Sequence, residues 1–226
     1  MDPSVQALEL GGVGLAGAGW LCSLATTLMT SWLTLSTELL PTEFYELGLW
    51  ETCVIQEHGG LECRPYEGLL GLPPNIKLAR IFMVLTLGAG LLGLLLAVPG
   101  LHVIICCSVP ANRRPCCHKR AMKAAGGVLC LVAGVLGLVP VSYMAHLAVL
   151  HYHDHDVPEM VPRWEFGDAL FCGWAGGVLN LVGGALLIAS CLCGQRESWH
   201  TPVPLQLIKA DPGHQGPPFK TRTEYV

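Results

Sequence analysis

Four long apolar stretches without a formal charge constrain this sequence more than any other feature. They cover approximately residues 10–30, 81–105, 124–146 and 169–193, and none of them contains Asp, Glu, Lys or Arg. A helix needs roughly 20 apolar residues to cross the hydrocarbon core of a bilayer. Only 13% of the 226 residues are charged, which is unlike a soluble domain. The sequence therefore predicts a four-span α-helical protein whose surroundings are a lipid bilayer, with no nucleic-acid partner.

The distribution of Lys and Arg predicts the orientation of the spans. Loop 106–123 contains no acidic residue and carries Arg113, Arg114, Lys119, Arg120 and Lys123. Loops 31–80 and 147–168 have no such excess of basic residues, and the first of them is rich in glutamate. Because positively charged short loops remain on the cytoplasmic side, we expect these two loops outside and both termini in the cytoplasm.

The eleven cysteines divide by compartment, and only Cys53 and Cys63 fall on the outer side. Disulfides persist outside the cell, so we expect these two residues to be bonded. Segments 33–40, 46–55 and 61–64 around them are rich in strand-forming residues, which predicts a small antiparallel sheet. A disulfide across such a hairpin stabilises it by about 2–4 kcal/mol.

Glycines recur within the predicted first and fourth spans. Gly173 and Gly177 form a small-xxx-small pair, which lets two membrane helices approach closely. This pattern predicts a compact helix bundle.

A set of outer-loop residues resembles the signature of the claudin family. In order, the set is Trp32, then Gly48-Leu49-Trp50, then Cys53, Cys63 and Arg80. The resemblance covers roughly residues 8–195. It implies a left-handed four-transmembrane-helix bundle with a five-stranded antiparallel outer sheet, four strands from the first loop and one from the second, and with Trp50 plugging the top of the bundle. We therefore expect a claudin-like domain over residues 1–195 and a disordered cytoplasmic tail over 196–226.

The resemblance implies a structural tight-junction protein of the plasma membrane. Such a protein assembles with other claudins in cis and in trans, and forms a paracellular barrier or a charge-selective pore. An alternative is an auxiliary subunit of another membrane protein, as in the related channel gamma-subunit and peripheral-myelin families. Those relatives usually carry an outer-loop glycosylation sequon, whereas this chain has no Asn-x-Ser/Thr. The absence of Cys-x-x-Cys and of ionisable pairs in the spans argues against an enzyme, and we expect neither a cofactor nor a metal.

Arg64 is the candidate residue for ion selectivity. In claudins the residue directly after the second loop cysteine helps to set the ion preference of the pore. A fixed guanidinium in a constriction favours anions, but Glu51, Glu57, Glu62 and Glu67 lie nearby in the sequence. The alternative is that Arg64 pairs locally with Glu62 or Glu67 on a solvated face, where an ion pair contributes about 1 kcal/mol or less.

Leu69, Trp164 and Phe166 are candidates for lateral contacts. Claudins pack side by side by inserting an apolar residue after the hairpin, here Leu69, into an aromatic-lined recess, here Trp164 and Phe166. The alternative is that all three residues pack within their own domain. Burying one such side chain contributes roughly 1.5–3 kcal/mol.

The second outer loop departs from the family pattern. Better-known claudins carry a pair of aromatic residues there, whereas this chain reads His151-Tyr152-His153-Asp154-His155-Asp156. Polar residues in place of this apolar aromatic pair weaken the prediction of strong adhesion between the membranes of opposing cells. If the run is extended, its three histidines share one face and can bind zinc or respond to mild acid, but a solvated loop is the simpler interpretation.

The chain ends on a sequence similar to the claudin motif that binds PDZ domains of junctional scaffold proteins. These residues are Thr223, Glu224, Tyr225 and Val226. A free C-terminal strand adds to a sheet edge, while the last side chain fills a pocket.

Juxtamembrane cysteines are candidates for S-acylation, as in the family. Those we single out are Cys106, Cys107, Cys191 and Cys193. The alternative is that they are buried or idle thiols.

Overall fold

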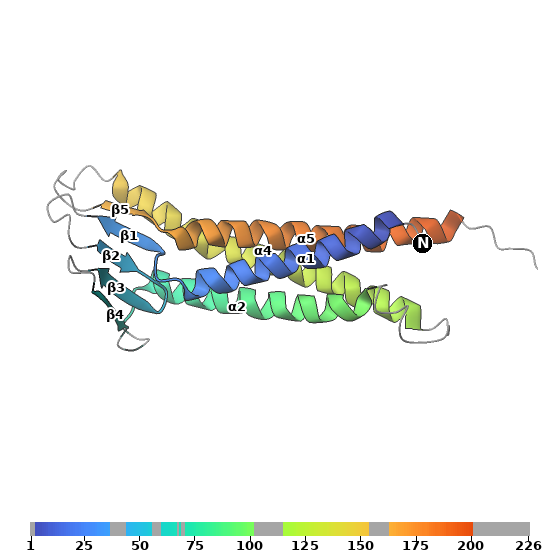
Figure 1. The fold of residues 1–226 in the computed structure, drawn as a ribbon, viewed down its shortest axis with the longest axis horizontal. Coiled ribbons are helices and arrows are strands. Elements are labelled where there is room, and N and C mark those ends of the chain that lie inside the picture. Colours follow the sequence, from blue (N-terminus) through green and yellow to red (C-terminus); the bar gives the residue numbers. More distant parts are fainter. Residues whose placement is uncertain are drawn as a thin grey trace, which may run out of the picture.

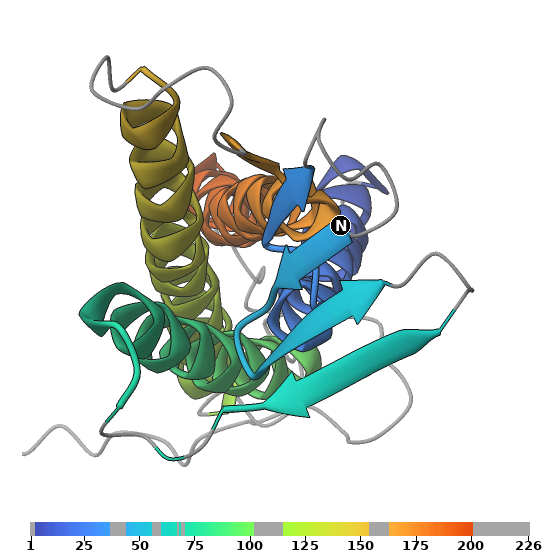
Figure 2. The same cartoon turned by 90° about the vertical axis from the view of Figure 1, so that its left-hand side faces the viewer.

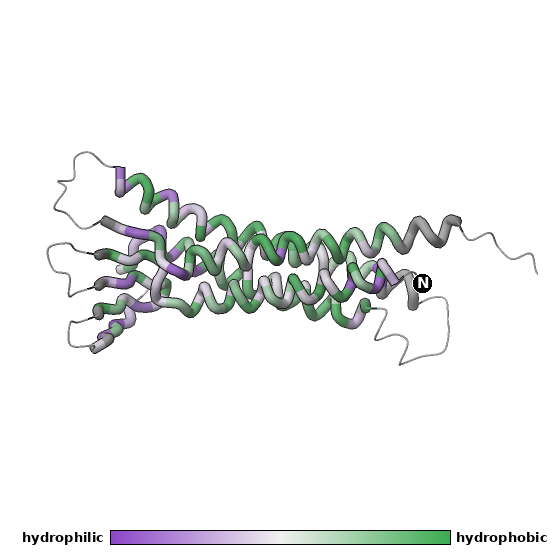
Figure 3. The backbone as a smooth tube through the Cα atoms, turned by 45° about the horizontal axis from the view of Figure 1, so that its top comes forward, coloured by the Kyte–Doolittle hydropathy of each residue, from purple (hydrophilic) through white to green (hydrophobic). Residues whose placement is uncertain are grey.

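The protein is an elongated helix bundle with a small sheet beyond one end (Figure 1). The computed structural model describes residues 3–36, 44–55, 60–66, 68, 71–101, 115–153 and 163–200. The N-terminus lies at the end of the bundle opposite the sheet. Hydrophobic residues run along the helices, and hydrophilic residues gather more densely at the sheet end (Figure 3).

All four long helices are long and apolar enough to cross a membrane. They are α1 (Pro3–Leu28), α2 (Pro74–Ala97, followed by the 3-10 turn η1, Val98–Gly100), α4 (Pro115–Tyr152) and α5 (Asp168–His200).

The third span belongs to a helix longer than a bilayer requires. With 38 residues, α4 is about 57 Å long. It extends past the stretch 124–146 at both ends, so parts of loops 106–123 and 147–168 are helical rather than irregular. Hydropathy locates the apolar part of such a helix but not its ends, because a helix continues beyond the membrane wherever capping and packing allow.

Glycines bring the helices into close contact. A Cβ at Gly173 would lie 2.6 Å from Val141 Cγ2 of α4, and one at Gly177 would lie 2.5 Å from Leu138 Cγ of the same helix. The pair Gly173 and Gly177 therefore packs inside the chain's own bundle. A Cβ at Gly183 would lie 2.6 Å from the backbone of α1. Glycines of α5 therefore allow close packing against two helices, α4 and α1.

The helices follow one another around the bundle in the order α1, α5, α4 and α2. α1 packs mainly on α5, α5 on α4, and α4 on α2, while α1 and α4 have few direct contacts. Figure 2 shows this arrangement from the sheet end.

The sheet has five antiparallel strands in the order β4-β3-β2-β1-β5. The strands are β1 (Leu33–Ser36), β2 (Phe44–Leu47), β3 (Glu51–Ile55), β4 (Leu61–Pro65) and β5 (Arg163–Phe166). Four come from the first outer loop and one from the second, as the resemblance implied.

Segment 46–55 is not one strand. It contains the end of β2, a turn and β3, because the chain reverses at Gly48. The Gly48 N–H donates to the carbonyl of Glu51 at 3.0 Å, and a Cβ at Gly48 would lie 2.8 Å from Thr30 Cα. Only glycine fits this close approach, so an apolar run that resembles one strand is interrupted.

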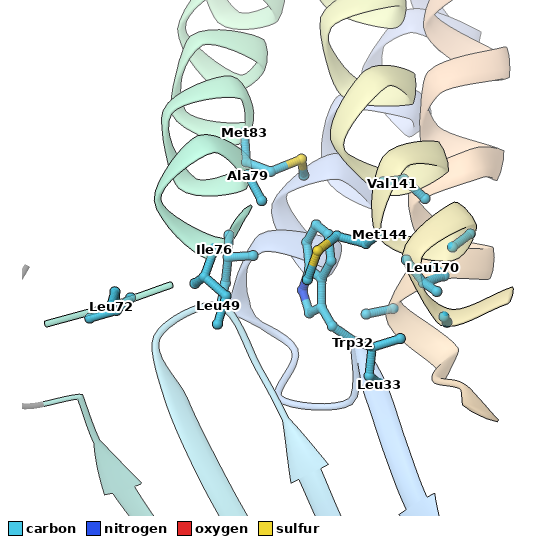
Figure 4. Close-up of a cluster of buried hydrophobic side chains, with 13 residues drawn as sticks. Trp32, Leu33, Leu49, Leu72, Ile76, Ala79, Met83, Val141, Met144 and Leu170 are labelled. Carbon is cyan, nitrogen blue, oxygen red and sulfur yellow. The ribbon is translucent and has the colours of Figure 1, made fainter. Parts of the chain in front are cut away.

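The main apolar core lies where the sheet meets the bundle. Trp32 is 0% exposed, and Figure 4 shows it in the middle of a cluster drawn from the sheet ends of α2, α4 and α5 and from the first outer loop. Leu49, Ile76, Met144 and Leu170 belong to the same cluster. This core fixes the sheet on the helices and thereby positions the outer surface.

Candidate functional site

Two tryptophans join the first outer loop to the end of α1. Trp32 Nε1 donates to the Thr26 carbonyl and Trp50 Nε1 to the Thr27 carbonyl, each at 2.9 Å. The last carbonyls of a helix have no partner within the helix, so both indoles satisfy otherwise unpaired acceptors. Trp50, which the resemblance implies as the plug of the bundle, is 42% exposed, whereas Trp32 is the completely buried indole at this end.

Arg80 of α2 connects the same loop to a second helix. Its Nε donates to the Leu49 carbonyl at 2.7 Å. Its guanidinium carbon lies 4.8 Å from the ring centre of Trp50 and 5.4 Å from that of Tyr66. These contacts are typical of cation–π interactions, and they explain how a nearly buried arginine is accommodated at the top of a membrane helix.

Tyr66 and Gly167 are residues of this junction that the sequence did not single out. The Tyr66 hydroxyl donates to the Gly48 carbonyl at 3.2 Å and accepts from Thr52 Oγ1 at 3.0 Å. Gly167 links β5 to α5, and a Cβ there would lie 2.0 Å from the Ser31 carbonyl oxygen. The sequence signal that could have identified Gly167 is its position as a lone glycine between a strand and the start of a helix.

Cys53 and Cys63 form the expected disulfide between β3 and β4. Glu51 lies close to both sulfurs, with one ligand atom of each residue within 4.8 Å of the others. Because the sulfurs are bonded to each other, neither is a thiolate that can bind a metal ion. The group is therefore a structural staple with a neighbouring carboxylate.

Arg64 lies on the edge strand β4 and pairs with Glu62. Arg64 Nη2 is 2.9 Å from Glu62 Oε1, and Nε donates to the same oxygen at 3.2 Å. The local pairing considered for Arg64 is thus present. The Arg64 side chain is 82% exposed, so the pair is screened by water and easily opened.

The face of the sheet that carries Arg64 also packs on the bundle. Residues paired across strands share a face, and residues alternate faces along a strand. Arg64 pairs with Thr52, which is in register with Leu47 and Leu33. Leu33 is buried in the core, so this face of the sheet packs on the bundle at β1. Arg64 lies on the same face, at the free edge that β4 forms.

The opposite face of the sheet carries three glutamates. Glu46 is in register with Cys53 on one side and Thr34 on the other, and Thr34 pairs with Glu165. Glu51, two residues before Cys53, points to the same face. We call Glu46, Glu51 and Glu165 the acidic face.

An apolar groove of about 290 Å³ lies between the outer end of α4 and the edge strand β5. Trp164 and Phe166 line it from β5, and Val149 and Tyr152 line it from α4. Phe166 also meets the ring of Trp174 edge to face, with centroids 6.3 Å apart. The two aromatic residues predicted for lateral contacts therefore border one open recess instead of being wholly buried.

Comparison with known proteins agrees with this geometry. The chain matches the PMP-22/EMP/MP20/Claudin family over residues 6–187. The chain belongs to this family. Claudin-3 of Rattus norvegicus is 34% identical over 221 residues, covering 96% of this chain and 95% of that protein. Claudin-3 of Homo sapiens is 32% identical over 221 residues, covering 96% of both chains. Claudin-7 of Mus musculus is 34% identical over 194 residues, covering 84% of this chain and 88% of that protein.

Membership of the claudin family gives the chain a coarse function. It is a multi-pass membrane protein of a family of structural tight-junction proteins. The signature residues that carried the resemblance, Trp32, Leu49, Trp50 and Arg80, are the ones that join sheet and bundle in the structure.

Several predicted sites of this claudin lie outside the described residues. They are Leu69, Cys106, Cys107, His155, Glu57, Glu67 and residues 201–226 with the C-terminal motif. The tail is predicted to be disordered from residue 196, but residues 196–200 belong to α5. Of the histidine run, His151 belongs to the last turn of α4 and His153 follows it in a turn. These two do not share the face of an extended strand, because the helix continues through Tyr152.

The two cysteines near the end of α5 differ in exposure. Cys193 is exposed, whereas Cys191 is buried beside Arg120, with its Sγ 4.0 Å from the Arg120 carbonyl oxygen. Transfer of an acyl chain requires an accessible thiol, so the geometry favours Cys193 over Cys191 as an acylation site.

Proposed function

We propose that this claudin is a strand-forming protein of tight junctions that packs side by side with other claudins and lines a charge-selective paracellular path. The groove between α4 and β5 carries the proposal. It lies beyond the apolar part of the helices, at a sheet edge, where a neighbouring copy in the same membrane can reach it. Its aromatic lining suits an apolar side chain such as Leu69 of that neighbour.

The groove gives the proposal a direct test. We expect the wild-type chain, expressed alone or with another claudin in fibroblasts that lack junctional strands, to form strands visible by freeze-fracture electron microscopy. Trp164→Ala removes one wall of the groove and is expected to shorten or abolish the strands.

Phe171→Ala is the matched control, because Phe171 is an exposed aromatic residue of α5 that does not line the groove. If the wild type reaches cell contacts but forms no strands in either setting, the proposal fails and the auxiliary-subunit alternative is favoured.

Charge selectivity rests on the two faces of the sheet. The positive charge of Arg64 is offset by Glu62, while the acidic face has three carboxylates at described positions and one arginine, Arg163, in register on the same face. Thr30 Oγ1 donates to Glu46 Oε2 at 3.1 Å, which holds one of them in place. A path along the acidic face would favour cations, whereas a path along the Arg64 edge would be nearly neutral or favour anions.

Dilution potentials across an epithelial monolayer distinguish these paths. Arg64→Gln is expected to increase cation preference only if the path follows the β4 edge, and Glu51→Gln to decrease it only if the path follows the acidic face. The variants are compared at matched surface levels. If neither substitution changes permeability, the charge-selective part of the proposal is wrong and a barrier role remains.

The cytoplasmic partners are proposed from the sequence. We propose that Val226 anchors the tail in PDZ domains of junctional scaffold proteins. Deleting Val226 is expected to abolish pull-down with such domains, and unchanged pull-down would exclude the motif. Among the cysteines after the fourth span, we propose Cys193 as the acylated residue, to be tested by acyl-exchange labelling of Cys193→Ser and Cys191→Ser.

A further inference from the structure

Two opposite charges are buried together near the end of the bundle opposite the sheet, which the positively charged loop predicts to be cytoplasmic. Lys123 Nζ of α4 is in direct contact with Glu9 Oε1 of α1. The Lys123 side chain is 4% exposed and the Glu9 side chain 1%. Lysine and glutamate are almost never so fully buried unless they are paired.

No sequence pattern predicts this arrangement. Lys123 stands among the basic residues of loop 106–123, and Glu9 lies just before the first apolar stretch. Each residue taken alone resembles an ordinary charge at the membrane boundary, where long side chains usually reach out to the headgroups. In the structure both turn inward.

The ion pair joins two helices that otherwise have little contact. α5 lies between α1 and α4 along most of the bundle, so α1 and α4 meet only sparsely. Glycine-mediated packing, which holds α5 to each of them, is therefore not available between α1 and α4. The pair supplies a diagonal connection there.

The same part of α4 also contacts the end of α5. Arg120, one helical turn before Lys123, donates from its guanidinium to the Cys191 carbonyl. That carbonyl belongs to the last part of the apolar stretch of α5. Within four residues, α4 therefore binds α1 through Lys123 and α5 through Arg120.

We propose that Glu9 and Lys123 form a cytoplasmic latch, a buried pair that closes the inner end of the bundle and is required for the native arrangement of α1 against α4. α1 is synthesised first and carries Glu9 into the membrane boundary without its partner. The charge is neutralised only when α4 has inserted and packed in register. The latch therefore couples correct assembly of the first and third spans to stability, and it acts independently of the proposed strand formation.

Breaking and removing the pair have different expected effects. Removal of one partner leaves a buried uncompensated charge, so Glu9→Gln and Lys123→Met are each expected to lower Tm in detergent by roughly 5–15 °C. Each is also expected to reduce the fraction of protein at the cell surface severalfold. The double variant Glu9→Gln/Lys123→Met leaves no buried charge, and we expect it to recover most of both quantities.

Two controls separate the latch from general charge effects. Lys119→Gln removes one positive charge from the same loop, and Glu165→Gln removes an exposed carboxylate; neither is expected to change Tm or surface delivery. If a single variant is too unstable to purify, the surface fraction measured by biotinylation provides the readout in cells. Unchanged single variants would overturn the proposal, and so would a double variant whose loss equals the sum of the two single losses.

Discussion

Trp32 and Trp50 hold two consecutive carbonyl oxygens at the end of α1, those of Thr26 and Thr27. One indole is completely buried and the other is nearly half exposed. Both residues thus bond to the end of the same helix, one from a buried position and the other from a partly exposed one. Their hydrogen bonds are alike, but the cost of losing each one is not.

We expect Trp32→Phe to be the more damaging substitution of the two. It deletes a buried donor and leaves both an unsatisfied carbonyl and a small cavity, which costs about 2–4 kcal/mol. At Trp50 water can replace the lost donor, so Trp50→Phe is expected to cost about 1 kcal/mol or less. Thermal unfolding of the purified protein in detergent measures the difference. Equal losses of stability would show that the difference in burial between the two indoles does not set their contributions.

Gly167→Ala is expected to prevent folding. The added methyl group would lie 2.0 Å from the Ser31 carbonyl oxygen, and the backbone of Ser31 and Trp32, just before β1, would have to move. Gly14→Ala is the matched control, because a Cβ at Gly14 meets nothing within 4 Å. Surface biotinylation and size-exclusion chromatography check the pair of variants. Normal delivery of Gly167→Ala would mean that the strand-to-helix connection tolerates a shift.

Arg80→Lys is expected to destabilise the junction although the charge is kept. A guanidinium can donate to the Leu49 carbonyl and lie over Trp50 and Tyr66 at once, whereas an ammonium lacks the planar surface. We expect a loss of about 1–3 kcal/mol. Thermal unfolding gives the size of the loss, and a shift in tryptophan emission reports the altered surroundings of Trp50. A stability equal to that of the wild type would show that the charge alone is sufficient.

Cys53→Ser is expected to loosen the sheet without unfolding the helices. The bond closes a short loop, with a sequence separation of 10, and its loss costs roughly 2–3 kcal/mol. Limited proteolysis is expected to cleave the β3–β4 hairpin faster, while the helical circular dichroism remains. Cys172→Ser, which removes a thiol outside the disulfide, serves as the control. Unchanged protease resistance would argue against the staple.

The sequence predicts those features that depend on local composition. Apolar length located the four spans, and the separation of cysteines by compartment identified the pair Cys53 and Cys63. The groove residues Trp164 and Phe166 came from the family resemblance, and no local pattern would have selected them.

Features that depend on tertiary contacts were not predictable in this way. Segment 46–55 has continuous strand propensity, and only the approach of Thr30 explains why it turns at Gly48. Trp32 and Trp50 are equivalent by residue type, and their different burial follows from packing. Lys123 resembles a loop residue until α1 brings Glu9 beside it.

The length of α4 makes the protein sensitive to the bilayer around it. A helix of 38 residues is nearly twice as long as a hydrocarbon core of about 30 Å is thick. Its outer end carries one wall of the groove. In a thicker, sterol-rich membrane, more of this helix is covered by lipid and the groove lies closer to the headgroups. Lipid composition would then set the height at which neighbouring molecules meet, so membrane thickness becomes a determinant of assembly.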